Sequence, residues 1–195
     1  MERDDPQLIA DYVNGDESAL PLLINRHLKA VYHFVYQLLG SATDAEDVTQ
    51  ETFFKAWKHL KKYRTDWRFR TWLFAIAKNT STDFLRKQRS ISFSEFERGE
   101  GESVLETTLA DSEPLPDELL ARAEDKKLLV KLLGKLSPLY RAVLLLRYDE
   151  ELTFDEIGKV LGKPLHTVKS QHRRALIELR TLIEAAPKGG FASYI

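Results

Sequence analysis

Cysteine is absent from this chain of 195 residues. Its absence excludes disulfides, thiolate metal ligands and thiol nucleophiles, and the chain suits a reducing compartment. No apolar run approaches the roughly 20 residues that a membrane-spanning helix needs. The first residues, MERDDPQ, do not resemble a signal peptide. We therefore expect a cytoplasmic protein.

The common signatures of catalysis are also missing. The sequence has no P-loop, no dinucleotide-binding glycine fingerprint and no nucleophile elbow. The histidine pairs that invite a metal search are His27 with His33 and His166 with His172, and each pair is spaced i, i+6. Helical zinc ligands are spaced i, i+4. We expect no enzymatic activity, no cofactor and no bound metal.

The net charge of the chain is small, but charge of one sign is concentrated in particular segments. The net charge is −1, with 43% hydrophobic and 30% charged residues, as in ordinary globular proteins. Residues 1–90 carry +2, residues 119–195 carry +5, and residues 91–118 between them carry −8. The chain length suits two small domains. Two basic modules joined by an acidic linker describe the sequence better than its net charge does.

Strand patterns are rare, and helix periodicity with capping signals recurs instead. We expect an all-α fold with two small helical domains, an N-terminal bundle and a C-terminal helix-turn-helix domain. The linker, 91–118, is rich in Ser, Glu and Gly and should be flexible. The expected helix starts are Asp5-Pro6, Asp16 with a disturbance at Pro21, Thr43 with Glu46 as a capping box, the residues after Trp67, Pro116-Asp117, and Ser137-Pro138.

Residues 152–179 carry start and stop signals for two helices joined by a tight turn. Thr153 and Glu156 form a capping box, and Gly162 supplies the left-handed conformation that ends a helix. Pro164 suits the first turn of a longer second helix. Two helices around a glycine-containing turn, with the second helix basic, are typical of a DNA-binding helix-turn-helix.

The second of these helices has two different sides. At about 100° per residue, the side expected to face the core contains Leu165, Val168, Ala175, Leu176 and Leu179. The candidate duplex-binding residues lie on the other side and its flanks: His166, Thr167, Lys169, Ser170, Arg173 and Arg174. Arginine can bind guanine bidentately, while lysine and threonine can hold phosphates. The alternative is a solvated basic surface.

Residues 61–90 combine basic and aromatic side chains. They contain nine basic residues against two acidic ones, with aromatic residues between them. Basic residues follow phosphates and aromatic rings stack on unpaired bases, so the composition favours single-stranded nucleic acid. The alternative is that the aromatics form a core. By helical angle this holds for Phe69 and Phe84, whereas Tyr63, Trp67 and Phe74 should remain available.

The segment from Asp44 to Trp57 has an acidic first half. Acidic residues in the first turn favour the helix dipole, which explains Asp44, Glu46 and Asp47. It does not explain Gln50 and Glu51 one turn later. Asp47, Gln50 and Glu51 share one face at i, i+3 and i+4. That face could dock a basic protein partner, or it could be an ordinary solvated surface.

Three motifs in order resemble the sigma factors of bacterial RNA polymerase. They are GSATDAEDVTQETFFKAW, FRTWLFAIAKNTSTDFLRK and LTFDEIGKVLGKPLHTVKS. The short two-domain layout is similar to the extracytoplasmic-function group of the sigma-70 family. The resemblance implies a sigma domain 2 in residues 1–90, a sigma domain 4 in residues 119–186, and a tail in 187–195.

The resemblance also implies roles for particular residues. Asp47, Gln50 and Glu51 would dock on the clamp helices of the largest polymerase subunit, and the flap would be a further contact of the core enzyme. The single-stranded minus-ten element would be bound by Arg64, Thr65, Asp66, Trp67, Lys78, Asn79 and Arg86. The helix-turn-helix would recognise the minus-thirty-five element as duplex, and the linker would follow the RNA-exit path. An anti-sigma factor, which in this family is often membrane-anchored, is implied as a further partner.

Two positions depart from the family pattern, and two alternatives remain open. His172 stands where the family usually has leucine, and we expect it to be neutral and bonded to a backbone carbonyl. Leu165-His166 replaces the usual Glu-Gly, so His166 could contact DNA or shift the helix.

The main alternative to a sigma factor is a stand-alone helix-turn-helix regulator that binds duplex DNA as a dimer. A sigma-like decoy is the other, although both basic surfaces argue against it.

Overall fold

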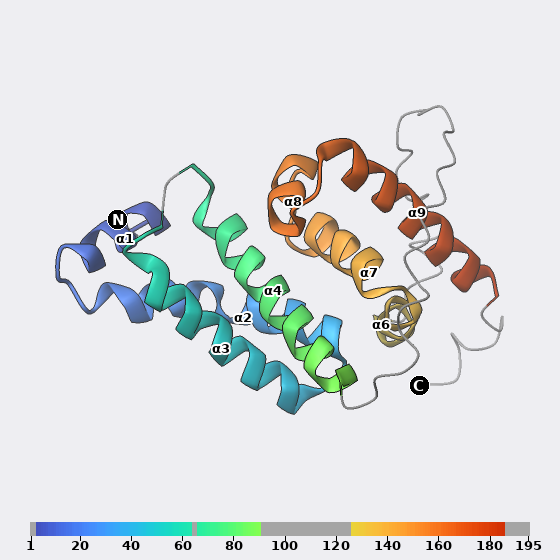
Figure 1. The fold of residues 1–195 in the computed structure, drawn as a ribbon, viewed down its shortest axis with the longest axis horizontal. Helices are drawn as coiled ribbons and strands as arrows, with labels where there is room; N and C mark the ends of the chain where they lie inside the picture. The colour runs from blue at the N-terminus through green and yellow to red at the C-terminus, as the bar shows by residue number, and fades with distance from the viewer. Residues whose placement is uncertain (1–2, 64–65, 91–125, 186–195) are drawn as a thin grey trace.

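The computed structural model describes residues 3–63, 66–90 and 126–185, and these form helices and no strands (Figure 1). The N-terminal half contains α1 (Asp5–Val13), α2 (Ala19–Leu39), α3 (Ala42–Leu60) and α4 (Phe69–Ser90). The C-terminal half contains α6 (Lys126–Lys135), α7 (Pro138–Leu144), the π-helical turn η1 (Leu145–Asp149), α8 (Phe154–Leu161) and α9 (Leu165–Glu184). The all-α prediction is confirmed. The predicted linker, the helix start at Pro116-Asp117 and the tail lie outside the described residues.

Side-chain caps set the starts of two N-terminal helices one or two residues earlier than predicted. The carboxylate of Asp4 accepts a hydrogen bond from the Gln7 backbone N–H at 2.9 Å, so Asp4 caps α1. Ser41, in an extended conformation, caps α3. The predicted capping box at Thr43 is therefore wrong, because Thr43 already lies inside the helix.

The start of α2 also differs from the prediction. Ser18 is the capping residue, although its side chain makes no capping hydrogen bond. Asp16 instead accepts a hydrogen bond from the Ser18 backbone N–H at 3.0 Å. Since α2 begins at Ala19, Pro21 lies in the first turn, where a missing N–H loses no helical hydrogen bond. The expected disturbance at Pro21 is absent for that reason.

The helix-turn-helix has the predicted local chemistry. The Thr153 hydroxyl accepts from the Glu156 backbone N–H at 3.3 Å, and the Glu156 carboxylate accepts from the Thr153 N–H at 2.9 Å. Gly162 adopts the left-handed conformation at φ 64° and ends α8. Both the capping box and the glycine turn are confirmed.

The inner side of α9 is confirmed except at its first residue. Val168, Ala175 and Leu179 are buried, and Leu176 is partly buried. Leu165 is 46% exposed, so its predicted place in the core is wrong. It opens the helix directly after an exposed turn, and no buried residue lies in that turn to cover it.

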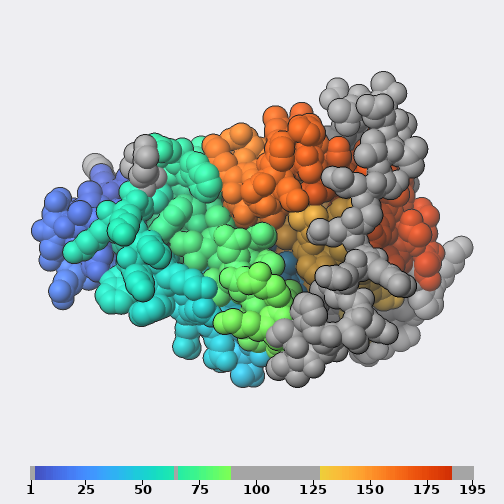
Figure 2. Space-filling view, in the orientation of Figure 1, coloured from blue at the N-terminus to red at the C-terminus, as the bar shows by residue number. Residues whose placement is uncertain are grey.

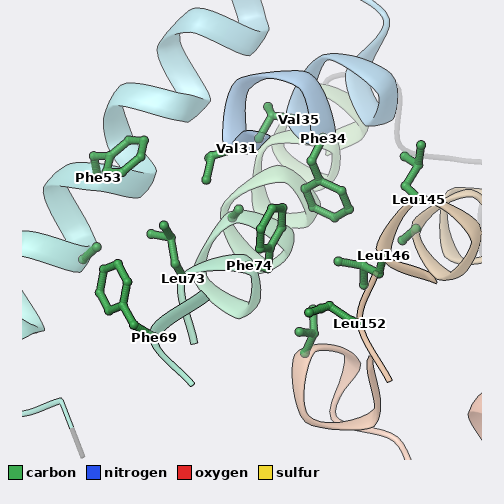
Figure 3. Close-up of a cluster of buried hydrophobic side chains, with 14 of the residues drawn as sticks. Val31, Phe34, Val35, Phe53, Phe69, Leu73, Phe74, Leu145, Leu146 and Leu152 are labelled. Carbon is green, nitrogen blue, oxygen red and sulfur yellow. The ribbon is translucent and has the colours of Figure 1, made fainter. Parts of the chain in front are cut away.

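One hydrophobic core extends through both halves of the molecule. Phe34 of α2 and Phe74 of α4 lie in the same buried cluster as Leu145, Leu146 and Leu152 (Figure 3). In the space-filling view the orange surface of α8 meets the green surface of α4 (Figure 2). The contact of α8 and the residues before it (145–153) with α4 and α2, called the seam below, joins the two halves.

The seam explains a wrong prediction about Phe74. We expected its ring to remain available for nucleic acid, but it is fully buried, with its edge against the Phe34 ring at 5.2 Å between centroids. The ring lies among side chains of both halves, including Phe34 and Leu146 (Figure 3). A contact between distant segments covers it, and helical periodicity within α4 carries no information about that contact.

Arg141 of α7 makes a second connection between the halves. Its guanidinium donates to the carbonyls of Gln37 and Leu38 at 3.1 and 3.0 Å, at the C-terminal end of α2. It also donates to the carbonyl of Leu133 at 2.8 Å in α6. A cation at a helix C-terminus satisfies carbonyls that have no helical partner.

No helix in the described ranges is long and apolar enough to cross a membrane.

Candidate nucleic-acid and polymerase interfaces

The predicted duplex-binding side chains gather on the solvent side of α9, called its outer face here. His166, Lys169, Arg173 and Arg174 are exposed, and Thr167 and Ser170 are half-buried at the edges. The Ser170 hydroxyl donates to the His166 carbonyl at 3.0 Å, which leaves its lone pairs to accept. The buried side of the same helix holds this surface rigidly on the core. Such an arrangement can place cationic donors along a groove of duplex DNA.

His172 lies on the inner side of α9 and is 3% exposed. Its Nε2 contacts the Tyr148 hydroxyl at 3.1 Å, and its ring packs against Phe154. The expected partner was a backbone carbonyl, so that detail is wrong. Burial, followed by the charge of Arg147, lowers the pKa of His172. The imidazole is therefore held neutral, as we expected.

The predicted single-strand residues lie along α4 and the loop before it. Asn79 and Arg86 are exposed seven residues apart, and Lys78 is half-buried beside them. Asp66 and Trp67 lie at the far end, where the Tyr63 hydroxyl donates to the Trp67 carbonyl. Arg64 and Thr65 lie outside the described residues. The described members thus follow one helix and its entry rather than forming one compact cluster.

The predicted docking side chains form an exposed acidic face on α3. Asp47, Gln50 and Glu51 are all exposed, and Glu51 pairs with Lys55 at 2.8 Å. The structure adds Phe54, which continues the same helical face and is 57% exposed. Its ring lies 5.8 Å from that of Trp57, which is 45% exposed. The i, i+3, i+7 spacing from Asp47 was available in the sequence and would have found Phe54.

Two domain models of one family match the chain. Residues 23–91 match sigma-70 region 2, and residues 132–181 match sigma-70 region 4. The chain is 31% identical to the ECF RNA polymerase sigma factor SigW of Bacillus subtilis, over 85% of this chain and 89% of that protein. The chain belongs to the extracytoplasmic-function group of the sigma-70 family.

Other relatives agree with this membership. The sigma factor CnrH of Cupriavidus metallidurans is 30% identical over 91% of this chain and 93% of its own length. A solved structure of CnrH in complex with the cytosolic domain of CnrY has a TM-score of 0.67 with this fold, at 27% identity. It covers 94% of this chain and 99% of the CnrH chain.

Membership in this family decides between the open alternatives. Extracytoplasmic-function sigma factors recognise promoters with RNA polymerase, and they are a family of transcription-initiation proteins. A stand-alone regulator is not favoured, because the region 2 match covers the half that would then be a sensing domain.

In the part of the chain that the structure describes, no three His, Asp or Glu side chains are grouped as a metal site would require.

The sigma factor holds acidic residues of its C-terminal half against basic residues of α4. The Arg70 guanidinium donates to the carboxylate of Glu150, whose side chain is only 4% exposed. Burial raises the pKa of Glu150, although the bond from Arg70 acts in the opposite direction. Sequence reasoning missed this pair, because its members are 80 residues apart and share no local pattern.

The three predicted surfaces of the sigma factor do not meet in one site. The docking face lies on α3, and α8 lies between α4 and the outer face of α9 (Figure 1). Asp66, Trp67 and Arg68 instead border a cavity of about 280 Å³, whose other wall is α8. Lys78 is partly buried near the helix-turn-helix, and burial followed by the charge of Lys163 lowers its pKa.

Proposed function

We propose that the two halves of this sigma factor recognise two promoter elements while α3 holds the polymerase. The observation that supports this division most directly is the outer face of α9. It presents exposed cationic side chains over its first three turns, while the opposite side of the helix is buried. In this proposal His166, Thr167, Lys169, Ser170, Arg173 and Arg174 contact the minus-thirty-five duplex.

The minus-ten element is assigned to α4 and the loop before it. Lys78 and Arg86 would hold phosphates of the non-template strand, while Asn79 and the loop residues Arg64, Thr65, Asp66 and Trp67 would receive an unstacked base. Extruding a base costs a few kcal/mol, about the amount that new stacking and phosphate contacts can offset. Strand opening would then begin without ATP.

The docking face of α3 is assigned to the clamp helices of the largest polymerase subunit. Asp47, Gln50 and Glu51 supply its charge and hydrogen bonds, and we add Phe54 as an apolar anchor. An exposed aromatic side chain with acidic neighbours suits an interface whose partner is basic at the edge and apolar at the centre. The flap would contact the C-terminal half.

An anti-sigma factor is a further proposed partner. CnrH was solved with the cytosolic domain of CnrY, and this chain has a comparable fold over almost its full length. By this likeness we infer that a regulatory protein binds the present chain. Attachment of that protein to a membrane would hold the sigma factor at the inner face of the membrane until release.

Run-off transcription with bacterial core polymerase on a random promoter library tests the assignment. Specific transcripts should require this protein, and their enriched upstream sequences should contain two conserved elements. Binding to duplex DNA as a dimer, with no binding to core polymerase, would contradict the proposal and indicate a stand-alone regulator. Binding to core without any transcript would indicate a decoy.

Variants separate the two promoter elements. Arg173→Ala or Arg174→Ala should relax selection at one or two upstream base pairs, with a loss of about 1–3 kcal/mol per bidentate contact. Arg180→Ala is the matched control, because Arg180 is exposed on the same helix beyond the proposed contacts. A uniform loss at every base pair, or an equal effect of Arg180→Ala, would contradict the assignment.

Asn79→Ala should slow strand opening while leaving upstream duplex binding unchanged, because its amide is assigned to the unpaired base. Gln88→Ala, which removes an exposed amide from the end of the same helix, is the control. Opening is followed with a fluorescent base analogue in the minus-ten element. An equal opening rate in the Asn79 variant and the wild type would remove Asn79 from the site.

A further inference from the structure

The seam lies against one end of the surface assigned to the minus-ten element, where α8 faces Asp66 and Trp67 across the cavity, while Asn79 and Arg86 remain exposed. The apolar part of the seam contains Phe74 of α4 and, from the C-terminal half, Leu146 and Leu152 (Figure 3). All three side chains are at most 4% exposed. The two halves are therefore packed at core density rather than lying loosely side by side.

Acidic side chains of the C-terminal half surround this apolar contact and bind basic residues of α4. Glu150 accepts from Arg70, and its carboxylate is nearly inaccessible to water. One oxygen of Glu156 accepts from the Thr71 hydroxyl at 3.4 Å and lies 3.8 Å from Nε of Arg68. The other Glu156 oxygen completes the capping box of α8. The cap that starts the DNA-binding motif thus also contacts α4.

These carboxylates lie near two cations, Arg70 and Arg68, that could otherwise attract phosphates. Arg68 and Arg70 follow Trp67 directly in the sequence, at the entry of α4. Across the cavity from Trp67 and Arg68, the wall is formed by Thr153, Glu156 and Lys159 of the helix-turn-helix. Single-stranded DNA cannot enter from that side while α8 is in place. Acidic groups paired with the same cations also remove part of the electrostatic attraction for DNA.

We propose that the free sigma factor inhibits itself, with α8 obstructing the loop end of the minus-ten surface at Asp66 and Trp67 and Glu150 acting as a latch on Arg70. This inference rests on the proposed assignment of α4 to the minus-ten element. In this proposal the inhibiting contact is made by α8 of the same chain, whereas an anti-sigma factor would inhibit as a separate protein.

The latch is suited to opening because its charged pair adds little net stability. Removing a carboxylate from water is costly, and the attraction of Arg70 offsets that cost without greatly exceeding it. The raised pKa of Glu150 agrees with this balance. Other polar contacts between the halves, among the residues that the structure describes, include the Arg141 bonds to α2 and the approach of His33 to Asp149 at 3.7 Å. Phosphates that bind Arg70 would leave the buried carboxylate unpaired and favour separation.

Replacing Glu150 with lysine tests the latch directly. Glu150→Lys places a cation against Arg70 and should open the seam, whereas Glu151→Lys makes the same charge change at an exposed neighbour. Affinity for a single-stranded minus-ten oligonucleotide is measured by fluorescence anisotropy without polymerase. If closed molecules outnumber open ones about tenfold, complete opening raises the apparent affinity for the oligonucleotide about tenfold. Glu151→Lys should show only the small common effect of added charge.

A reversible cross-link tests the same proposal in the opposite direction. The chain has no cysteine, so His33→Cys with Asp149→Cys introduces the only two thiols, both at half-exposed positions on opposite sides of the seam. A short, reducible thiol cross-linker should join them in the closed form. The joined protein should lose single-strand binding and transcription, and reduction should restore both. In the Glu150→Lys background the cross-linking rate should fall about tenfold.

These measurements distinguish a failure of the latch proposal from a failure of the proposed function. The cross-linking rate depends on neither DNA nor polymerase, so an unchanged rate in Glu150→Lys overturns the latch whatever the function. If the His33→Cys/Asp149→Cys protein transcribes equally well when cross-linked, that would also overturn the latch, while leaving the sigma assignment intact. Unchanged upstream duplex binding by Glu150→Lys shows that the C-terminal half remains folded. If that binding is lost, the cross-linked His33→Cys/Asp149→Cys protein, in which Glu150 is intact, decides the question.

Discussion

His172 is the residue whose surroundings predict a measurable pH dependence. Its ring is buried between Tyr148 and Phe154, and no hydrogen-bond partner is found for its Nδ1. An imidazole without a second partner is poorly placed to accept a proton. The lowered pKa means that the unfolded chain, with histidine near its ordinary value of about 6.5, binds protons more readily than the folded one.

We expect the free energy of unfolding to decrease as the pH falls from about 7.5 through 6.5. The contribution of His172 is at most about 1.4 kcal/mol per pH unit. His172→Leu should remove it. Urea denaturation of the wild type and of His172→Leu at several pH values gives the difference between their free energies of unfolding. This difference isolates His172, because Glu150, whose pKa is raised, changes stability with pH in the opposite sense in both proteins. Parallel pH profiles would contradict a neutral buried His172.

At the scale of the element, the tight turn of the helix-turn-helix depends on Gly158. A Cβ built there would lie 2.8 Å from the carbonyl oxygen of Lys163 and 3.8 Å from the Val168 side chain. The first of these contacts is with backbone, which cannot rotate away. The close approach of α8 to the turn before α9 therefore requires the absence of a side chain.

Gly158→Ala should destabilise the protein by about 1–3 kcal/mol, the range expected when a core is overpacked. It should also weaken upstream duplex binding by shifting α9. Gly134→Ala in α6 is the control, because a Cβ there meets nothing within 4 Å and alanine favours a helix by up to about 1 kcal/mol. Thermal unfolding and duplex affinity measure both effects. Equal stability of the two variants would show that the turn can relax.

Elements were predictable where their signals are local. Thr153 with Glu156 and the left-handed Gly162 define α8 within ten residues, and Ser137 caps α7 as expected. Thr43 shows the limit of such signals, since Ser41 competes for the same role two residues earlier. Local chemistry predicts that a helix begins, while the choice between adjacent caps depends on the conformation of the preceding chain.

At the scale of the whole molecule, the shared core predicts that the two halves stabilise each other. Leu146→Ala should cost about 2–5 kcal/mol, as for other buried leucines. It should accelerate amide hydrogen exchange in α4 as well as in α8, because Leu146 and Phe74 belong to one cluster. Leu179→Ala is the control, since Leu179 belongs to a second cluster formed by α6, α7 and α9. Exchange confined to α8 in the Leu146 variant would contradict a shared core.

The contact between the halves was beyond prediction from the sequence. The candidate DNA and docking side chains were chosen from helical faces, and most of those in the described ranges are exposed as expected. Two burials could not be predicted in this way: Phe74 lies in a core cluster that it shares with Leu146, and Glu150 is buried against Arg70. Their partners lie some 70 to 80 residues away, across a linker with weak periodicity. Neither composition nor helical angle specifies which exposed faces will meet.

The ion pairs of the seam also affect how the protein searches the chromosome. Every cation that binds a DNA phosphate releases about 0.7–0.9 of a condensed counterion, which makes non-specific binding steeply salt-dependent. In the closed form that we propose, Arg70 is already paired with the buried Glu150. The closed chain would therefore enter the cell's large excess of non-specific sites with fewer available cations than its sequence contains. A larger share of its molecules would stay unbound and within reach of core polymerase.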